Sequence, residues 1–291
     1  MTTDAITAYV STAQDADSDA EDKKLKVTKI PSSELEYLGF NFDNKYLAKK
    51  EVRQAIALAI DTESLIQDNY GGAGITSDSV YFPGFLGTEN KGDFYKQDQK
   101  GASELLQKSG FKDSNEDGIL EDSKGRDFQL TILVNSNDGS RSDTASSISE
   151  ALNQIGIKAS VKKVSWAEYR SEVRSGDFDL FLGGYQFDKK YDLRSLFSKS
   201  NYLGYKNDRI LASVKKLETC ISAEQQKETY EKLKTMLQEE LPYYSLCYKT
   251  YSFITVKEFT STETPTFFDM YRGCDTWKWK KVVVTEQKDD K

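Results

Sequence analysis

Residues 113–125, DSNEDGILEDSKG, place oxygen-bearing side chains at alternate positions and follow them with a glycine. A calcium loop of the EF-hand kind needs oxygen ligands at positions 1, 3 and 5, a glycine at 6, a main-chain carbonyl at 7 and an acid at 12. Position 12 is Lys124, so an earlier acid would have to close the site. The candidate calcium ligands are Asp113, Asn115, Asp117, Ile119 and Glu121, with Asp122 as an alternative to Glu121.

The same loop residues also build a tight turn that binds no metal. Asp and Asn side chains accept hydrogen bonds from their own backbone two residues on, and glycine adopts positive φ without strain. Both interpretations stay open at this point. In either case the loop is a structural connection between a helix and a strand and not the site of function, and calcium is a possible ligand of it.

Catalytic chemistry has little support in the residue types. The chain contains no histidine, which removes Ser-His and Cys-His pairs, and it carries no Gly-rich phosphate-binding motif. Its cysteines, Cys220, Cys247 and Cys274, are too few and too scattered for a disulfide framework or a zinc site. We therefore expect no enzyme and no required cofactor, and we interpret the cysteines as packing residues or free thiols.

Composition limits the classes of partner. The formal net charge is −7, which argues against nucleic acid because proteins that bind it carry a basic face. No stretch approaches the roughly 18 apolar residues that span a bilayer, and the N-terminal residues lack a basic start followed by an apolar run. The chain as written therefore encodes neither a membrane anchor nor an export signal.

The middle of the chain alternates strands with helices. Residues 128–135, 157–165 and 178–185 have strand patterns, and residues 142–156 and 166–176 have apolar positions at helical spacing. Short β-α-β-α-β connections favour parallel strands, right-handed crossovers and a sheet covered by helices. The sequence thus predicts an α/β fold.

Ligands of open α/β sheets gather beyond the carboxyl ends of the strands, where helix N-termini also present donors. Side-chain amides suit ligand contacts because each one both donates and accepts hydrogen bonds. Large aromatic residues at the same ends supply apolar contact area. These rules select six ligand-binding candidates on one rim of the sheet: Asn135, Asn137, Trp166, Gly184, Tyr185 and Gln186.

Four motifs, in order along the chain, carry a family resemblance. They are YLGFNFDNKYLAKKEVRQAIALAID at 37–61, residues 101–125, residues 147–185 and EELPYYSL at 239–246. Together they resemble family 5 of the extracellular solute-binding proteins, the oligopeptide, dipeptide and nickel receptors of ABC importers. The resemblance implies a periplasmic-binding-protein type II-like lobe with a mixed, largely parallel sheet flanked by helices, plus hinge and return strands.

The same resemblance divides the chain into three parts. Residues 1–34 are expected to be a linker and a remnant of an N-terminal lobe, 35–280 a C-terminal solute-binding lobe with hinge strands, and 281–291 a tail. The rest of the N-terminal lobe, the export signal and the lipid-attachment cysteine are expected outside this sequence. The implied whole protein is an extracellular or cell-surface lipoprotein, a monomer that captures peptides or other small solutes and delivers them to a membrane permease.

The resemblance also bears on how a ligand would be bound. Peptide-binding members place an aspartate just after the strand that corresponds to 178–185, where it pairs with the ligand's amine. Here Gly184 and Tyr185 take that place, while Asp188 and Asp192 come later.

Arg53 of the VRQAI motif is expected in a surface ion pair or against the lobe junction, with a role in binding a ligand carboxylate as the alternative. The alternative function for the chain is a calcium-stabilised surface interaction module derived from such a receptor.

Overall fold

The computed structural model describes residues 8–11, 25–92, 94–187, 193–198, 201–263, 265–267, 269 and 271–279. These residues belong to two compact units. The larger unit is Ser33–Lys249, and the smaller is formed by Met1–Ser32 with Thr250–Lys291. Two long strands run from one unit into the other, β2 (Leu25–Phe40) and β7 (Tyr243–Val256).

The larger unit contains a mixed sheet in the order β7-β2-β6-β4-β5, with β3 paired to β7. The parallel pairings are β4 with β5 and β4 with β6, whereas β2 with β6 and β3 with β7 are antiparallel. The shorter strands are β3 (Gly74–Ile75), β4 (Gln129–Asn135), β5 (Lys158–Val164) and β6 (Leu180–Gln186). The three predicted parallel strands and the mixed sheet are confirmed, although the parallel part is confined to β4, β5 and β6.

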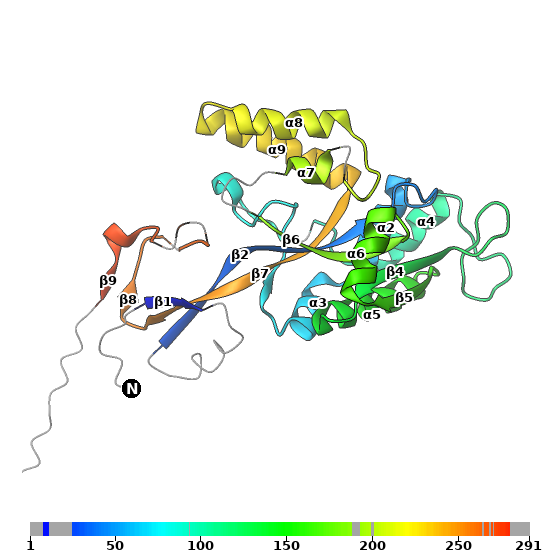
Figure 1. Ribbon diagram of the computed structural model, residues 1–291, viewed down its shortest axis with the longest axis horizontal. Helices are drawn as coiled ribbons and strands as arrows, with labels where there is room; N and C mark the ends of the chain where they lie inside the picture. Colours follow the sequence, from blue (N-terminus) through cyan, green and yellow to red (C-terminus); the bar gives the residue numbers. More distant parts are fainter. Residues whose placement is uncertain are drawn as a thin grey trace, which may run out of the picture. The chain divides into compact units, whose positions relative to one another are not determined.

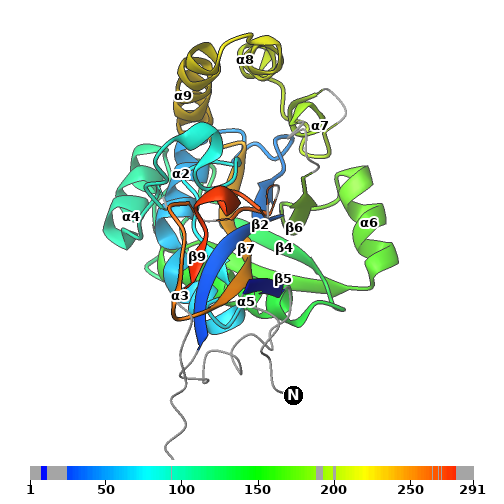
Figure 2. The same cartoon turned by 90° about the vertical axis from the view of Figure 1, so that its left-hand side faces the viewer.

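Helices cover this sheet on both faces (Figures 1 and 2). Figure 2 shows α6 on one side of β4 and β6, and α2, α3 and α4 on the other. The helices are α2 (Lys50–Ala59), α3 (Thr62–Asn69), η1 (Phe85–Gly87), α4 (Gln99–Lys108), α5 (Gly139–Gln154), α6 (Trp166–Ser175), α7 (Arg194–Phe197), α8 (Asp208–Thr219) and α9 (Ala223–Glu240). Among the described residues, no helix is both long and apolar enough to cross a membrane.

The main core lies between the sheet and helices α2, α4 and α5. Ile132 of β4 packs there with Ile148 and Leu152 of α5, all three fully buried. Leu133, on the opposite face of β4, is also buried, as expected for a strand covered on both sides. β5 stands at the edge of the sheet with exposed Lys158, a residue type that discourages pairing with another chain.

Arg53 of α2 does not form the surface ion pair that was one of its two expected placements. Its side chain is 1% exposed and packs at 4.4 Å from the Phe42 ring. The guanidinium donates to the carbonyls of Leu47 (2.7 Å), Leu241 (3.1 Å) and Glu240, and so satisfies carbonyls at the end of α9 that have no partner inside the helix. Burial lowers the pKa of Arg53 to about 10, which leaves it charged at neutral pH.

The smaller unit is a strand structure with its own apolar cluster. β1 (Ala8–Ser11) pairs antiparallel with the Ser252–Thr255 part of β7, and β8 (Phe259–Thr260) pairs with β9 (Lys278–Trp279). A short helix, η2 (Cys274–Thr276), precedes β9. The cluster consists of buried Ile30, Phe253 and Phe259, with the Trp277 ring 5.4 Å from that of Phe259.

Candidate functional site

The end of β6 presents unpaired main-chain groups. β6 pairs with β4 only at Leu180 and Phe181, whereas its pairing with β2 continues to Gln186. The Phe187 N–H donates to the Ser33 carbonyl over 2.9 Å, so alternate residues of β6 direct their main-chain groups at β2 and the others at the opposite edge. The N–H and C=O groups of Gly184 and Gln186 face that opposite edge, where no described strand pairs with them.

A cavity that is open to solvent lies beside this edge of β6. Aromatic rings form much of its wall: Trp166 stacks on Tyr169 at 5.4 Å, and Tyr37 meets Phe181 edge-on at 5.7 Å. The Tyr169 hydroxyl donates to the Leu182 carbonyl over 2.7 Å, which ties α6 to β6. The described lining consists of Tyr37, Arg141, Trp166, Tyr169, Arg170, Val173, Arg174, Phe181, Gly183, Gly184 and Tyr202.

A helix cap places Trp166 at the cavity. The Ser165 hydroxyl accepts from the Glu168 N–H, and the Glu168 carboxylate accepts from the Ser165 N–H, which forms a capping box. The hydroxyl and N–H of Ser165 together lower the pKa of Glu168. α6 therefore begins at Trp166, whose side chain is 49% exposed at the mouth of the cavity.

Charged side chains lie directly under Gly184. Arg141, near the start of α5, donates to both carboxylate oxygens of Glu36 over 2.7 and 2.9 Å, and Lys249 lies 3.1 Å from the same carboxylate. Burial opposes the charge of Arg141, but its hydrogen bonds to Glu36 raise its pKa overall. A Cβ added at Gly184 would lie 2.1 Å from Nη2 of Arg141, so only glycine fits there without movement.

The cavity lining is electropositive. Its described part contains three arginines and no acidic side chain. Arg141 is already paired with Glu36, so Arg170 and Arg174 carry the positive charge that is open to a ligand. Arg170 and Arg174 are exposed on α6, and neither forms an ion pair within the described part of the chain. Such a lining attracts carboxylates and other anions in preference to amines.

The six ligand-binding residues predicted from the sequence divide into two groups. Trp166 and Gly184 line the cavity. The remaining residues are not among its lining: Asn135 is buried at the end of β4 with no partner for its Oδ1, and Asn137 is exposed beyond it. Tyr185 bonds Ser195 at 2.9 Å and packs on Phe187, while Gln186 ends β6 and is exposed.

The shared rim therefore stays a prediction for Asn135, Asn137, Tyr185 and Gln186. Successive residues of a strand point to opposite faces, so Tyr185 lies on the face of Phe181 and Gly183, whereas Gly184 faces Arg141. The later acids Asp188 and Asp192 lie outside the described residues. Sequence reasoning missed Arg141 and Tyr37, and the one local signal was that Arg141 follows the Asp138 cap of α5 by three residues.

The acidic loop forms the predicted tight turn. The Asp113 carboxylate accepts from the N–H groups of Glu116 and Gly118 over 2.8 and 3.0 Å, and Asp117 accepts from Ile119 over 2.9 Å. One carboxylate oxygen from each of Asp113, Asp117 and Glu121 lies within 4.8 Å of the others. The Asx turns and the grouping of acids thus coexist in one loop.

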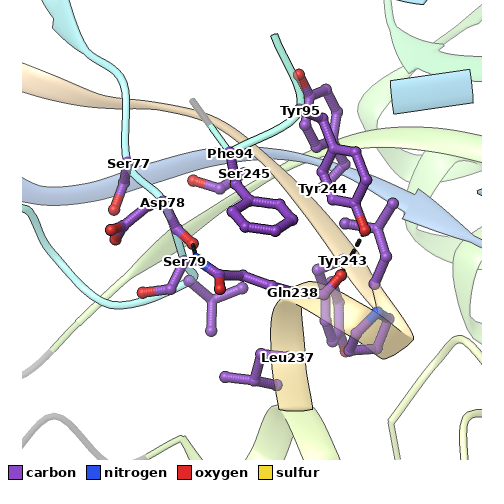
Figure 3. Close-up of a pocket in the computed structure, with 13 residues that line it drawn as sticks. Ser77, Asp78, Ser79, Phe94, Tyr95, Leu237, Gln238, Tyr243, Tyr244 and Ser245 are labelled. Atoms are coloured by element: carbon purple, nitrogen blue, oxygen red, sulfur yellow. Dashed lines mark hydrogen bonds between the residues drawn. The ribbon is translucent and has the colours of Figure 1, made fainter. Parts of the chain in front are cut away.

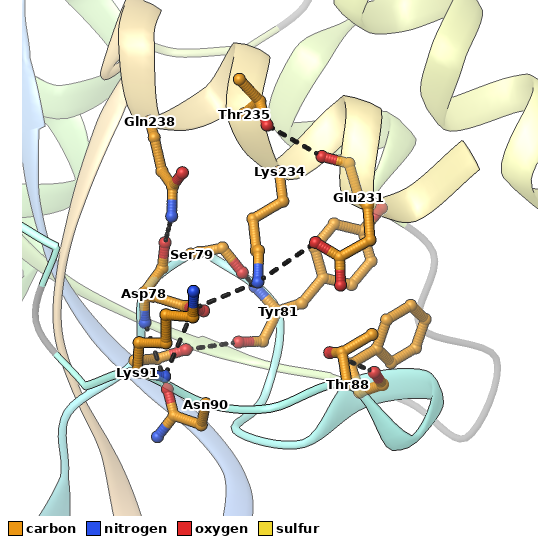
Figure 4. A network of polar contacts seen from close by, with 12 residues as sticks. Asp78, Ser79, Tyr81, Thr88, Asn90, Lys91, Glu231, Lys234, Thr235 and Gln238 are labelled. Carbon is orange, nitrogen blue, oxygen red and sulfur yellow. Dashed lines mark hydrogen bonds and ion pairs between the residues drawn. The ribbon is translucent and has the colours of Figure 1, made fainter. Parts of the chain in front are cut away.

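A second, small cavity lies between α9 and the segment around residues 77–95 (Figure 3). Its wall is mainly aromatic and aliphatic and includes Phe94, which is 55% exposed. A polar network behind it fastens α9 to that segment (Figure 4). In this network Lys234 lies 3.2 Å from the Asp78 carboxylate, and Gln238 donates to the Asp78 carbonyl over 2.8 Å. Asp78, the charged residue of the cavity's described lining, is thus already paired with Lys234.

The cysteines form no described disulfide or metal cluster. Cys220, Cys247 and Cys274 are free thiols. Burial raises the pKa of Cys247 to about 12, which makes it an unreactive packing residue.

Comparison with known proteins identifies relatives. The model of the bacterial extracellular solute-binding proteins, family 5 Middle, matches residues 2–205. The chain is 29% identical over 225 residues to the oligopeptide-binding protein AppA of Bacillus subtilis (strain 168), a match that covers 73% of this chain and 41% of that protein. The chain therefore spans about two fifths of that relative's length.

Solved structures share the fold. AppA from Bacillus subtilis in complex with a nonapeptide superposes with a TM-score of 0.73 at 24% identity, covering 95% of this chain and 56% of that one. NikZ from Campylobacter jejuni in complex with Ni(L-His) gives a TM-score of 0.70 at 23% identity, covering 94% and 57%. Related folds thus hold both a peptide and a metal complex as their solutes.

Proposed function

Because the chain belongs to family 5 of the bacterial extracellular solute-binding proteins, we propose that it captures an extended peptide as part of the substrate-binding component of an ABC importer. The family and the type II-like periplasmic-binding fold expected from the sequence are confirmed. Members of the family are solute-binding proteins and not enzymes, and they act outside the cytoplasm. Their peptide-binding members need no cofactor.

The open edge of β6 is the observation that carries the proposal. An extended peptide adds to such an edge as a further strand, and its main-chain groups pair with those of the protein irrespective of side chains. Gly184 and Gln186 supply the protein's groups, and Trp166 and Tyr169 supply aromatic contact area beside them. This arrangement suits a receptor that accepts many peptide sequences.

The positive lining refines the ligand class. Arg170 and Arg174 attract a carboxylate, whereas the place where family members carry an amine-binding aspartate is held here by Gly184 and Tyr185. The proposed ligand is therefore held through main-chain pairing and through a carboxylate, either its C-terminus or an acidic side chain. A ligand held mainly by its free amine is disfavoured.

The proposal also covers the whole protein. A second lobe closes over the bound peptide by hinge motion, and the closed form delivers the peptide to a membrane permease. The complete protein is a monomeric lipoprotein on the cell surface. The proposed domain boundaries at 34/35 and 280/281 belong to the same hypothesis.

Peptide titration of the chain tests the proposal. The chain has three tryptophans, so the double variant Trp277→Phe, Trp279→Phe leaves Trp166 as the fluorescent reporter at the cavity. We expect hexa-alanine to change its emission, and the C-terminally amidated peptide to bind several-fold more weakly. N-methylation of single peptide amides should weaken binding at every second position, because alternate residues of a strand face its partner.

Matched aromatic variants distinguish the two cavities. Trp166→Ala should weaken peptide binding by roughly 5- to 30-fold, because the lost contact is worth about 1–2 kcal/mol. This variant lacks the fluorescent reporter, so its affinity is measured by calorimetry. Phe94→Ala removes a comparably exposed ring from the second cavity and should leave affinity unchanged. The opposite pattern would move the site to the second cavity.

An N-methyl scan without a period of two would exclude strand pairing. A chain that responds to calcium but to no peptide would favour the interaction-module alternative.

A further inference from the structure

The acidic loop between α4 and β4 gathers negative charge that no basic side chain of the described residues neutralises. Carboxylate oxygens of Asp113, Asp117 and Glu121 lie within 4.8 Å of one another. None of the three forms an ion pair with a Lys or Arg in the described part of the chain. The neighbouring Asp122, by contrast, pairs with Lys45 at 3.2 Å and with Arg126 at 2.5 Å. Lys45 and Arg126 therefore pair with Asp122 and not with the three-acid cluster.

Glu121 provides a second and independent sign of a missing partner. Its side chain is 5% exposed, and Oε2 accepts from the Ser114 N–H over 2.7 Å. The other oxygen, Oε1, is buried without any hydrogen-bond partner. Leaving a charged oxygen buried and unsatisfied is costly, so this atom points to a ligand that arrives from outside the protein.

We propose that this loop binds a calcium ion. The carboxylates of Asp113, Asp117 and Glu121 supply its charged ligands. The Asn115 side chain and the Ile119 carbonyl stand at the third and seventh loop positions, where calcium loops supply further oxygen ligands. The Ile119 carbonyl accepts no hydrogen bond from the described residues, so it is free to coordinate. This site is independent of the proposed peptide function.

The donor set selects the kind of ion. All ligands are oxygens, which suit hard cations and not zinc or copper. Calcium accepts the flexible coordination of an irregular loop, whereas magnesium demands near-ideal octahedral geometry and keeps several waters. Lys124 replaces the bidentate acid at position 12, so we expect affinity in the range of extracellular modules, with Kd of about 10⁻⁴–10⁻³ M.

The ion would stabilise the fold of the larger unit. Leu120, inside the loop, is buried in the main core, and its N–H donates to the Gly156 carbonyl over 2.8 Å. Glu121 pairs with Lys112 on one side and Asp127 on the other as short β-bridges. A ligand that binds only the folded form raises the midpoint of thermal unfolding, Tm.

Thermal unfolding of the chain in chelator-treated buffer tests the site. Calcium at about ten times Kd should raise Tm by about 3–5 °C, and magnesium at equal ionic strength should have a much smaller effect. Asp117→Asn should raise the calcium concentration needed for this response at least tenfold, because an amide oxygen replaces one of the charged ligands. In chelator alone this variant should unfold at or above the wild-type Tm, because one repelling charge is gone. Glu116→Gln makes the same change of charge on an exposed side chain outside the cluster and should keep the full response.

Calorimetric titration gives a second readout that does not depend on unfolding. Wild type and Glu116→Gln should bind one calcium, and Glu121→Gln should bind at least tenfold more weakly. A wild-type chain with no calcium response, an equal response to magnesium, or an Asp117→Asn variant that responds like wild type would each overturn the calcium site. If Glu116→Gln also lost the rise in Tm with calcium, general screening of surface charge would explain that rise, and not a bound ion.

Discussion

Gly184→Ala tests how tightly the Glu36–Arg141 pair fills the space beneath β6. The new Cβ would lie 2.1 Å from Nη2 of Arg141 and 3.2 Å from Oε1 of Glu36. The guanidinium must therefore move, which breaks hydrogen bonds of 2.7 and 2.9 Å to a carboxylate that is 2% exposed. Lys249 stays 3.1 Å from that carboxylate and limits the loss.

The expected cost follows from these contacts. Hydrogen bonds to charged groups contribute about 1.5–3 kcal/mol each, and the remaining lysine together with solvation of the displaced guanidinium offsets part of this loss. Alanine at a position without positive φ recovers about 0.4–1 kcal/mol of backbone entropy. The net destabilisation should be about 2 kcal/mol, which lowers Tm by about 4–8 °C.

Urea unfolding of four chains measures this effect: wild type, Gly184→Ala, Arg141→Ala and the double variant. Gly139→Ala is the matched control, because Gly139 is the first residue of α5, has no positive φ and has no atom within 4 Å of an added Cβ. We expect the control to be unchanged or slightly stabilised. In the Arg141→Ala background, Gly184→Ala should change the free energy of unfolding little, since the clashing guanidinium is gone. An equal cost in both backgrounds would refute the assignment of Arg141 to this space.

Three further perturbations follow from other contacts. Lys234→Met leaves the buried Asp78 carboxylate without its 3.2 Å partner and should cost about 3–5 kcal/mol in urea unfolding, with much of the loss recovered by adding Asp78→Asn. Hydrogen bonds, led by those from Arg126, hold the pKa of Asp122 well below its usual range. The resulting stability is therefore present above pH of about 4 and lost as the pH falls toward the folded-state value, and Asp122→Asn should flatten the unfolding curve over that acid range. Tyr169→Phe removes the 2.7 Å bond to a β6 carbonyl and should cost about 1 kcal/mol, a loss that thermal unfolding would register as about 2–4 °C.

The residue pattern was most informative where structure is local. The strand expected at 157–165 is β5 at Lys158–Val164, and the helix expected at 166–176 is α6 at Trp166–Ser175. Apolar periodicity, the Ser165 cap and a final glycine determine such boundaries within a few residues of chain. Trp166 could be predicted as a cavity residue for the same reason, because its place depends on the start of one helix.

Contacts between distant segments were not predictable in this way. Glu36 and Arg141 are 105 residues apart, and Arg53 meets the end of α9 across 188 residues. The antiparallel pairing of β2 with β6 decides that Gly184 faces the Arg141 side and Tyr185 the other. A shift of one residue in that register would exchange the two.

The sequence by itself thus determined the family, the alternation of strands and helices, and the turn at 113–121. The spacing of apolar residues and the residues that begin or end helices and turns set local conformation, and both can be read from neighbouring residues. The tertiary structure decided which edge of β6 stays open, which arginines surround it, and that Glu121 is buried with an unsatisfied oxygen. These features arise from strand register and from packing between segments far apart in the chain, and no local pattern of residues encodes either one.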